Sequence, residues 1–186
     1  FASDRYAEAR DAYGEAVAIA PDIATRGWAS IGRADALAAL DNTDAALAIF
    51  REHRTAADPE VATQARIREA QLHLGLEAWP SALDAVEPLD VAELGPGWDA
   101  TLTETRCAAH VGMGNPDQAA AEWTALETRW PEAEEARLPA WLGLADLAAS
   151  LGDTDEAMQL AKRALDGTDD PGYRARAEEI LASNRP

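Results

Sequence analysis

The residue types that most often carry catalysis or metal binding are rare in this sequence and lie far apart. His53, His73 and His110 fall on three separate predicted helices, and their spacing matches no metal-ligand signature. Catalysis needs a nucleophile or an acid–base pair held together in a pocket, and the sequence groups no such residues. We therefore expect no catalytic residue, no metal site and no cofactor. A metal shared by His73 and His110, at equivalent points of two adjacent repeats, is the less favoured alternative.

Cys107 and the glycine-rich stretch also have structural explanations. Cys107 lies on the apolar face of a predicted helix and is expected to be inert. Because it is the single cysteine, no internal disulfide can form. Gly95-Pro96-Gly97 lacks the lysine and the strand–turn–helix context of a phosphate-binding loop. We interpret it as a longer loop inside one repeat.

The charge balance narrows the class of partner. The formal net charge is −18, from 34 acidic and 16 basic residues. Nucleic-acid binding needs a basic surface to contact phosphates, so we expect a protein or peptide partner and no nucleic acid. No stretch approaches the roughly 18 apolar residues of a membrane span, so we expect none in this segment.

One short pattern returns five times along the chain. It is anchored on alanines at intervals of 36 to 38 residues, and an apolar residue follows each anchor four positions later. The anchors are Ala9, Ala46, Ala82, Ala119 and Ala157. A period between 20 and 50 residues is typical of stacked repeats. The small side chains predict positions where two helices touch closely.

Apolar residues recur with the helical period throughout, and no segment shows the alternation of a strand. Helices are predicted over residues 4–20, 24–40, 44–57, 60–76, 79–89, 98–112, 116–129, 138–151, 154–166 and 171–183. The predicted fold class is all-α, an array of antiparallel helix pairs. Repeat units are predicted at 1–22, 23–58, 59–90, 91–130 and 131–168, with a C-terminal capping helix at 171–184.

We expect a single helical-repeat domain over residues 1–186, because a stacked array shares one continuous core. The sequence begins at Phe1, without a methionine and inside a repeat. We therefore interpret it as a fragment of a longer chain.

The repeated pattern resembles the tetratricopeptide repeat, whose second helix has small residues at fixed points and often a proline at its exit. The matching residues include Ala9, Tyr13, Ala16 and Pro21, and again Ala119, Trp123, Leu126 and Pro131. The resemblance implies a right-handed superhelical array of about five repeats plus the capping helix. The first helices match less well, because Arg33, Glu69 and Arg106 stand where the family usually has a large apolar residue.

The repeats are longer than the commonest form of the family. The stretch 129–153 is similar to the longer repeats of bacterial envelope proteins, such as the periplasmic partner of the Tol–Pal system and the lipoprotein of the barrel-assembly machinery. The stretch 58–89 and the last helix resemble an ancillary subunit of the secretion translocon. On this resemblance we favour the bacterial periplasm or cell envelope over the cytoplasm.

The family's pattern implies a concave face lined by the first helix of each pair. The residues that it places there are Trp28, Ile31, Asp35, Gln64, Ile67, Gln71, Thr101, Glu104, Leu142 and Asp146. Apolar residues flanked by amides and carboxylates suit an extended or helical peptide, and the carboxylates favour a neutral or basic one. The alternative for Trp28, Ile31, Ile67 and Leu142 is that they belong to the core.

These observations favour a non-catalytic protein–protein interaction module, a scaffold or adaptor in a bacterial assembly. The alternative is a structural or oligomerising spacer that self-associates through its end faces and so forms a homo-oligomer. A third interpretation is a regulatory domain attached to an enzyme elsewhere in the parent chain.

Overall fold

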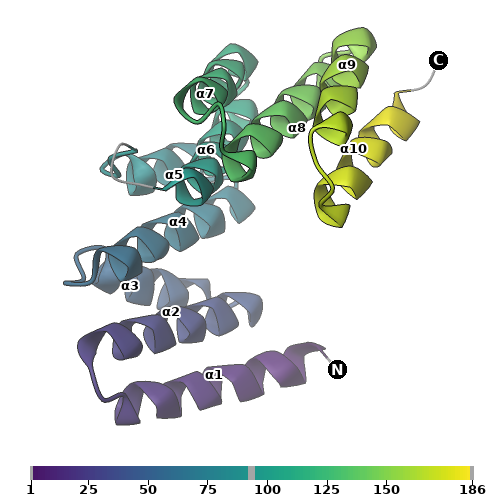
Figure 1. Cartoon of the computed structure of the whole chain (residues 1–186). Coiled ribbons are helices and arrows are strands. Elements are labelled where there is room, and N and C mark those ends of the chain that lie inside the picture. Colours follow the sequence, from purple (N-terminus) through teal and green to yellow (C-terminus); the bar gives the residue numbers. More distant parts are fainter. Residues whose placement is uncertain (1, 92–94, 185–186) are drawn as a thin grey trace. The chain divides into compact units, whose positions relative to one another are not determined.

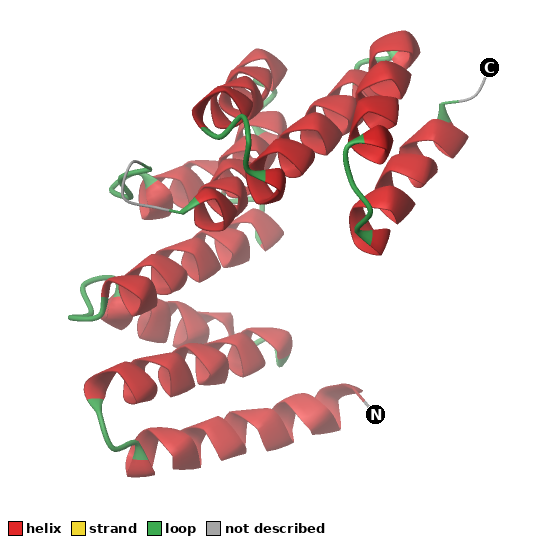
Figure 2. Cartoon of the chain, viewed as in Figure 1, coloured by secondary structure: helices red, strands yellow, loops and turns green. Residues whose placement is uncertain are grey.

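The computed structural model describes residues 2–91 and 95–184, and these fold into ten helices without a strand (Figures 1 and 2). The helices are α1 (Ala2–Ile19), α2 (Ile23–Ala39), α3 (Thr43–His53), α4 (Pro59–Gly75), α5 (Trp79–Val86), α6 (Pro96–Gly112), α7 (Pro116–Arg129), α8 (Glu134–Ser150), α9 (Thr154–Asp166) and α10 (Pro171–Ser183). The predicted all-α class is confirmed. The predicted repeat unit 91–130 includes residues 92–94, which lie outside the described residues.

Two helices have an end that lies about one helical turn from its predicted position. The helix predicted over 44–57 ends at His53, because the following residues form the connection to Asp58, whose carboxylate caps α4. The helix predicted from 138 begins at Glu134, so Pro139 lies inside it. Proline cannot donate a hydrogen bond to the carbonyl four residues earlier. Burial of Ala136 and Leu138, both fully inaccessible, draws the first turn of α8 into the core despite that loss.

The helices form two compact units, Phe1–Leu89 and Asp90–Pro186, which we describe separately. In both units each helix contacts the next one along the chain. Helices two apart also contact one another, α2 with α4 in the first unit and α6 with α8 and α8 with α10 in the second. This places the first helices of successive pairs side by side, as stacked helix pairs require. A single continuous domain over 1–186 stays a prediction.

Small residues sit where the helices approach closely. Ala46, Ala82 and Ala157 are fully buried and Ala119 is 1% exposed, whereas Ala9 on the first helix is only partly buried. The core of the first unit gathers around Phe50, and that of the second around two tryptophans, Trp123 and Trp141. The anchor alanines therefore mark helix contacts, as the spacing predicts.

A helix must be both long and apolar to cross the hydrocarbon core of a bilayer. Within residues 2–91 and 95–184, no helix is both long and apolar enough to span one.

Candidate functional site

The second unit contains an open cavity of about 870 Å³, which we call the groove. Its walls come from the first helices α6, α8 and α10, and α7 adds one side chain to the floor. The lining residues are Gly97, Ala100, Thr101, Glu104, Trp123, Glu135, Pro139, Leu142, Gly143, Asp146, Asp170, Gly172, Tyr173 and Arg176. A cavity of this size accommodates several side chains of a bound segment.

Four residues that the repeat pattern places on the concave face line this groove. Thr101 and Glu104 lie one helical turn apart on α6, and Leu142 and Asp146 lie one turn apart on α8. Contact between α6 and α8 brings the two pairs into one surface. Leu142 is 6% exposed, so it serves both the core and the groove floor. That these residues bind a partner stays a prediction.

The floor depends on a close approach of Trp123 to Gly143. A methyl group added at Gly143 would lie 2.2 Å from Cε2 of the Trp123 indole, far inside van der Waals contact. Glycine is therefore what allows the indole of α7 to lie against the backbone of α8. In the first unit Tyr13 packs against Gly32 in the same way, with ring carbons 2.6 Å from the corresponding position.

The third wall is positioned by the connection between α9 and α10. Thr168 is buried, and its hydroxyl donates a hydrogen bond to Glu134 at the start of α8 and accepts one from the Asp170 amide at 3.0 Å. Asp170 then caps α10 by accepting from the amides of Gly172 at 2.8 Å and Tyr173 at 3.1 Å. These bonds fix the first turn of α10, and with it Tyr173, beside α8.

The electrostatics of the groove are dominated by carboxylates. Its lining includes four acidic residues and one base, Arg176. Arg176 donates to Asp146 at 2.8 Å and to Glu179 at 2.6 Å, and these bonds raise the pKa of its guanidinium. Arg176 therefore neutralises Asp146 and leaves the other carboxylates of the groove uncompensated.

The Tyr173 side chain lies in the negative electrostatic potential of the groove carboxylates. The pKa of its phenol is raised first by partial burial and then by the charges of nearby carboxylates, which disfavour the phenolate. The contributing residues are Asp170, Glu134, Glu135 and Glu104. Carboxylates of α6, of α8 and of the α10 cap thus act together on one ring.

The predicted residues of the first unit fall into two groups. Ile31 and Ile67 are 3% and 1% exposed, so they pack in the core and offer almost no surface. Trp28 is 39% exposed on α2. The Asp35 carboxylate lies 3.6 Å from the Arg68 guanidinium. Burial raises the pKa of the Asp35 carboxyl.

The remaining polar residues of that set lie on α4. Arg68 donates to the Gln71 side chain at 3.1 Å, and Gln64 is partly buried one turn before Arg68. Since α2 and α4 are in contact, these residues with Trp28 and Asp35 lie on neighbouring first helices. One continuous surface from Trp28 to Asp146 stays a prediction.

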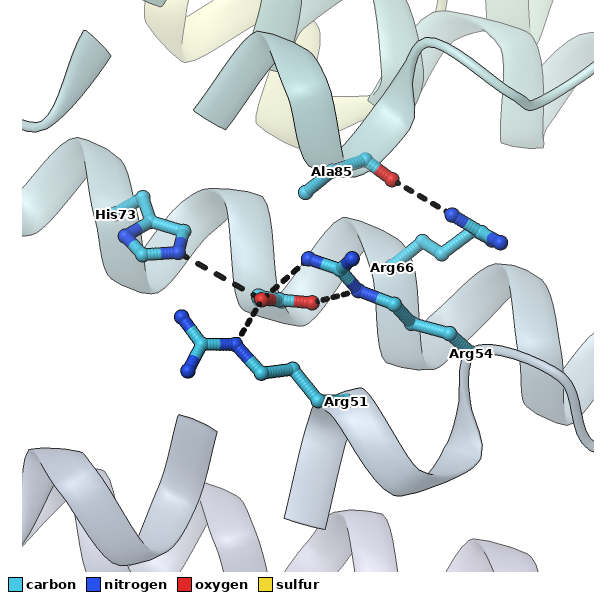
Figure 3. Close-up of polar contacts among 6 residues, drawn as sticks. Arg51, Arg54, Arg66, His73 and Ala85 are labelled. Carbon is cyan, nitrogen blue, oxygen red and sulfur yellow. Dashed lines mark hydrogen bonds and ion pairs between the residues drawn. The ribbon is translucent and has the colours of Figure 1, made fainter. Parts of the chain in front are cut away.

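Glu69, which stands where the family usually has a large apolar residue, is fully buried on α4. Arg54 pairs with both oxygens of its carboxylate, and Arg51 donates to Oε1 at 3.1 Å. His73 lies 3.6 Å from the same oxygen one turn later (Figure 3). A buried carboxylate fixed by two arginines from the α3 end replaces the usual apolar contact between these helices.

The other two exceptions in the first helices have simpler explanations. Arg33 is exposed on α2, so no apolar side chain is needed there. Arg106 is half-buried on α6, and its guanidinium lies 3.9 Å from the carboxylate of Glu122 on α7. Charged residues at these two positions are therefore compatible with the packing of the first helices.

Cys107 is placed as a core residue. Its side chain is 4% exposed and donates to the Ala119 carbonyl at 3.3 Å. Burial, with a smaller effect of the Glu122 charge, raises its pKa to about 12, so the reactive thiolate is scarce at neutral pH. Among the residues that the structure describes, no group of three or more His, Cys, Asp and Glu could hold a metal ion.

The sequence pattern did not predict the contributions of Trp123, Glu135, Tyr173 and Arg176 to the groove. Tyr173 and Arg176 belong to the helix interpreted as a cap. The available signal was its position, since α10 follows α9 just as α8 follows α7 and is the next first helix of the series.

Comparison with known families identifies part of the second unit. Residues 109–173 match the family described as Tetratricopeptide repeat. The matched segment contains α7, α8 and α9 entire and reaches the first turn of α10. A comparison with curated proteins finds no match.

Proposed function

We propose that this chain, which belongs to the tetratricopeptide repeat family, is a protein-interaction module whose groove in the second unit takes a segment of a partner protein. Repeats of this family generally mediate protein–protein interaction and are typically non-catalytic. The specific role that we propose is a scaffold or adaptor without an activity of its own.

One observation carries the proposal. Side chains from two neighbouring first helices, with Thr101 and Glu104 on one and Leu142 and Asp146 on the other, line a single open cavity. Its floor is apolar, with Trp123 and Leu142, and its rim is polar. This combination suits a linear segment whose apolar side chains are buried while its polar groups stay near water.

A role in a bacterial assembly, in the periplasm or cell envelope, is part of the proposal. The similarity of the longer repeats to envelope proteins supports it. The partner would then be another protein of that assembly, bound through the groove.

A specific observation favours self-association as the second candidate function. Helix α1 presents large apolar side chains to solvent, with Tyr6 45%, Tyr13 42% and Ile19 81% exposed. Exposed apolar faces at the end of a repeat array can pair with a like copy. Light scattering at rising protein concentration separates the two candidates, because only the spacer function requires a mass above that of the monomer.

The proposal is tested by capturing partners from the source organism with three versions of the chain. Thr101→Arg places a long charged side chain in the groove, and Ala125→Arg adds the same side chain at an exposed position of α7. We expect Thr101→Arg to abolish capture and Ala125→Arg to leave it intact. Capture that survives Thr101→Arg and is lost with Ala125→Arg would move the binding surface outside the groove.

A fourth version tests whether the first unit takes part. Large aromatic residues concentrate binding energy at interfaces, and Trp28 is the exposed aromatic of α2. If binding extends to α2, Trp28→Ala should reduce the binding free energy of the recovered partner by more than about 1 kcal/mol. The helix content of the variant should stay unchanged. Unchanged affinity would confine the site to the second unit.

A further inference from the structure

We infer that the segment bound in the groove is basic, and that a lysine or arginine of the partner lies against the Tyr173 ring, facing Glu104, Glu135 and Asp170. This inference rests on the proposed function and names the chemistry of the partner.

The charge of the lining is the first support. Four carboxylates face one guanidinium, a formal excess of three negative charges in a cavity of about 870 Å³. The guanidinium of Arg176 is already engaged by Asp146 and Glu179. It therefore has little capacity left to attract an acidic partner.

The second support is that two of the carboxylates are not used by the fold. Within residues 2–91 and 95–184, no hydrogen bond or ion pair engages the side chain of Glu104 or Glu135, although both line the groove. Glu127 in the same unit is held, by contrast, by Trp141 and Arg163 at 2.8 Å each. Carboxylates without a structural partner at the rim of a cavity are available for a cation.

The third support is the position of Tyr173. The ring is half-buried on α10 and lies within the field of Asp170, Glu135 and Glu104. An aromatic face surrounded by negative charge attracts a guanidinium or ammonium group through both the ring quadrupole and the carboxylates. The same field repels phosphate and carboxylate groups, so an acidic segment is excluded.

The apolar floor adds a second feature of the partner. Ala100, Pro139, Leu142 and Trp123 are apolar residues of the same lining. They offer a place for an apolar side chain close to the bound cation. The fitting segment therefore combines basic and apolar residues. A second copy of this chain, with its net charge of −18, is a poor occupant.

The test uses the intact chain and three labelled peptides of one length, built from leucine and glycine with arginine, citrulline or glutamate at the charged positions. Citrulline keeps the shape of arginine and removes its charge. Fluorescence anisotropy at low salt should show the arginine peptide binding at least about tenfold tighter than the citrulline peptide, and the glutamate peptide not binding. The advantage should shrink as salt rises, because exposed charges are screened over about 10 Å at 0.1 M.

Two double variants separate the groove from the general acidity of the protein. Glu104→Gln with Glu135→Gln removes the unused groove carboxylates, and Glu156→Gln with Glu178→Gln removes two exposed charges outside the lining. We expect the first to abolish most of the arginine advantage and the second to keep it. Tyr173→Leu should weaken the arginine peptide several-fold more than Tyr173→Phe, which retains the ring.

The outcomes distinguish this inference from the proposed function. Equal binding of the arginine and citrulline peptides, both lost with Thr101→Arg, would overturn the basic partner and leave the groove standing. Equal losses in the two double variants, or no measurable binding of the arginine peptide, would also overturn it. Binding of every peptide unaffected by Thr101→Arg would instead overturn the groove itself.

Discussion

The indole of Trp123 on α7 lies directly against the backbone of Gly143 on α8, closer than any side chain at position 143 would allow. Both residues line the groove, so this contact joins the packing of a helix pair to the shape of the binding surface. The shape of the groove floor therefore depends on the packing of the core.

Gly143→Ala should therefore destabilise the protein and disturb the groove together. The added methyl would overlap the indole, which has to move, and overpacking of this kind costs about 1–3 kcal/mol. Urea unfolding measures the cost. Gly97→Ala is the control, because its methyl would meet only the flexible Glu135 side chain at 4.0 Å. Equal stability of the two variants would mean that Trp123 does not pack on Gly143.

Ala119→Leu tests the anchors of the repeat. Ala119 is 1% exposed between α6 and α7, so a larger side chain should overpack the contact and cost about 1–3 kcal/mol. Ala125→Leu on the same helix points to solvent and should change the free energy of unfolding by no more than about 0.5 kcal/mol. Thermal or urea unfolding of the two variants measures the difference. An Ala119→Leu variant with the stability of the original protein would contradict the close helix contact at Ala119.

The sequence was sufficient for the repeat because the anchors obey a local rule: only small residues fit where two helices touch. It was insufficient for the start of α8. The helix predicted from residue 138 begins at Glu134, because burial of Ala136 and Leu138 outweighs the hydrogen bond that Pro139 cannot donate inside it. Such gains come from partners distant in sequence, which a single helix pattern does not contain.

Glu69→Gln tests the buried ion pair of the first unit. The substitution keeps the size of the side chain but removes the charge that both arginines contact. Hydrogen bonds to charged groups contribute about 1.5–3 kcal/mol, and we expect a loss in that range. Glu60→Gln, at an exposed position of the same helix, should change stability much less. Similar unfolding midpoints for both variants would show that the pair contributes nothing net.

Stability at high pH should respond to Tyr173. Its pKa in the folded chain is raised above the usual 10.0, so the native state keeps the phenol proton where the unfolded chain loses it. The associated stability is fully present below pH 10 and is lost as the pH rises through the folded pKa. Tyr173→Phe has no such proton and should show a flatter decline above pH 10. Parallel pH profiles of the two proteins would contradict the raised pKa.

The candidate site was predicted only in part. The repeat pattern predicts four of the lining residues, because it places their positions on the concave side of a first helix. They are Thr101, Glu104, Leu142 and Asp146. Tyr173 and Arg176 do not, since their role depends on α10 packing beside α8 rather than simply covering the end of the array. Ile31, Ile67 and Leu142 occupy equivalent positions and all three are buried, yet Leu142, at 6% exposed, also lines the groove. Whether such a position reaches a cavity depends on the packing around each helix, which the repeat pattern does not contain.

Site-specific crosslinking shows whether the partner lies in the groove. A photoreactive amino acid is placed at Thr101, in the groove, or at Ala125, exposed on α7, and each protein is illuminated with the captured partner. We expect a crosslinked partner from position 101 and none from position 125. Efficient crosslinking from position 125 with none from position 101 would contradict it.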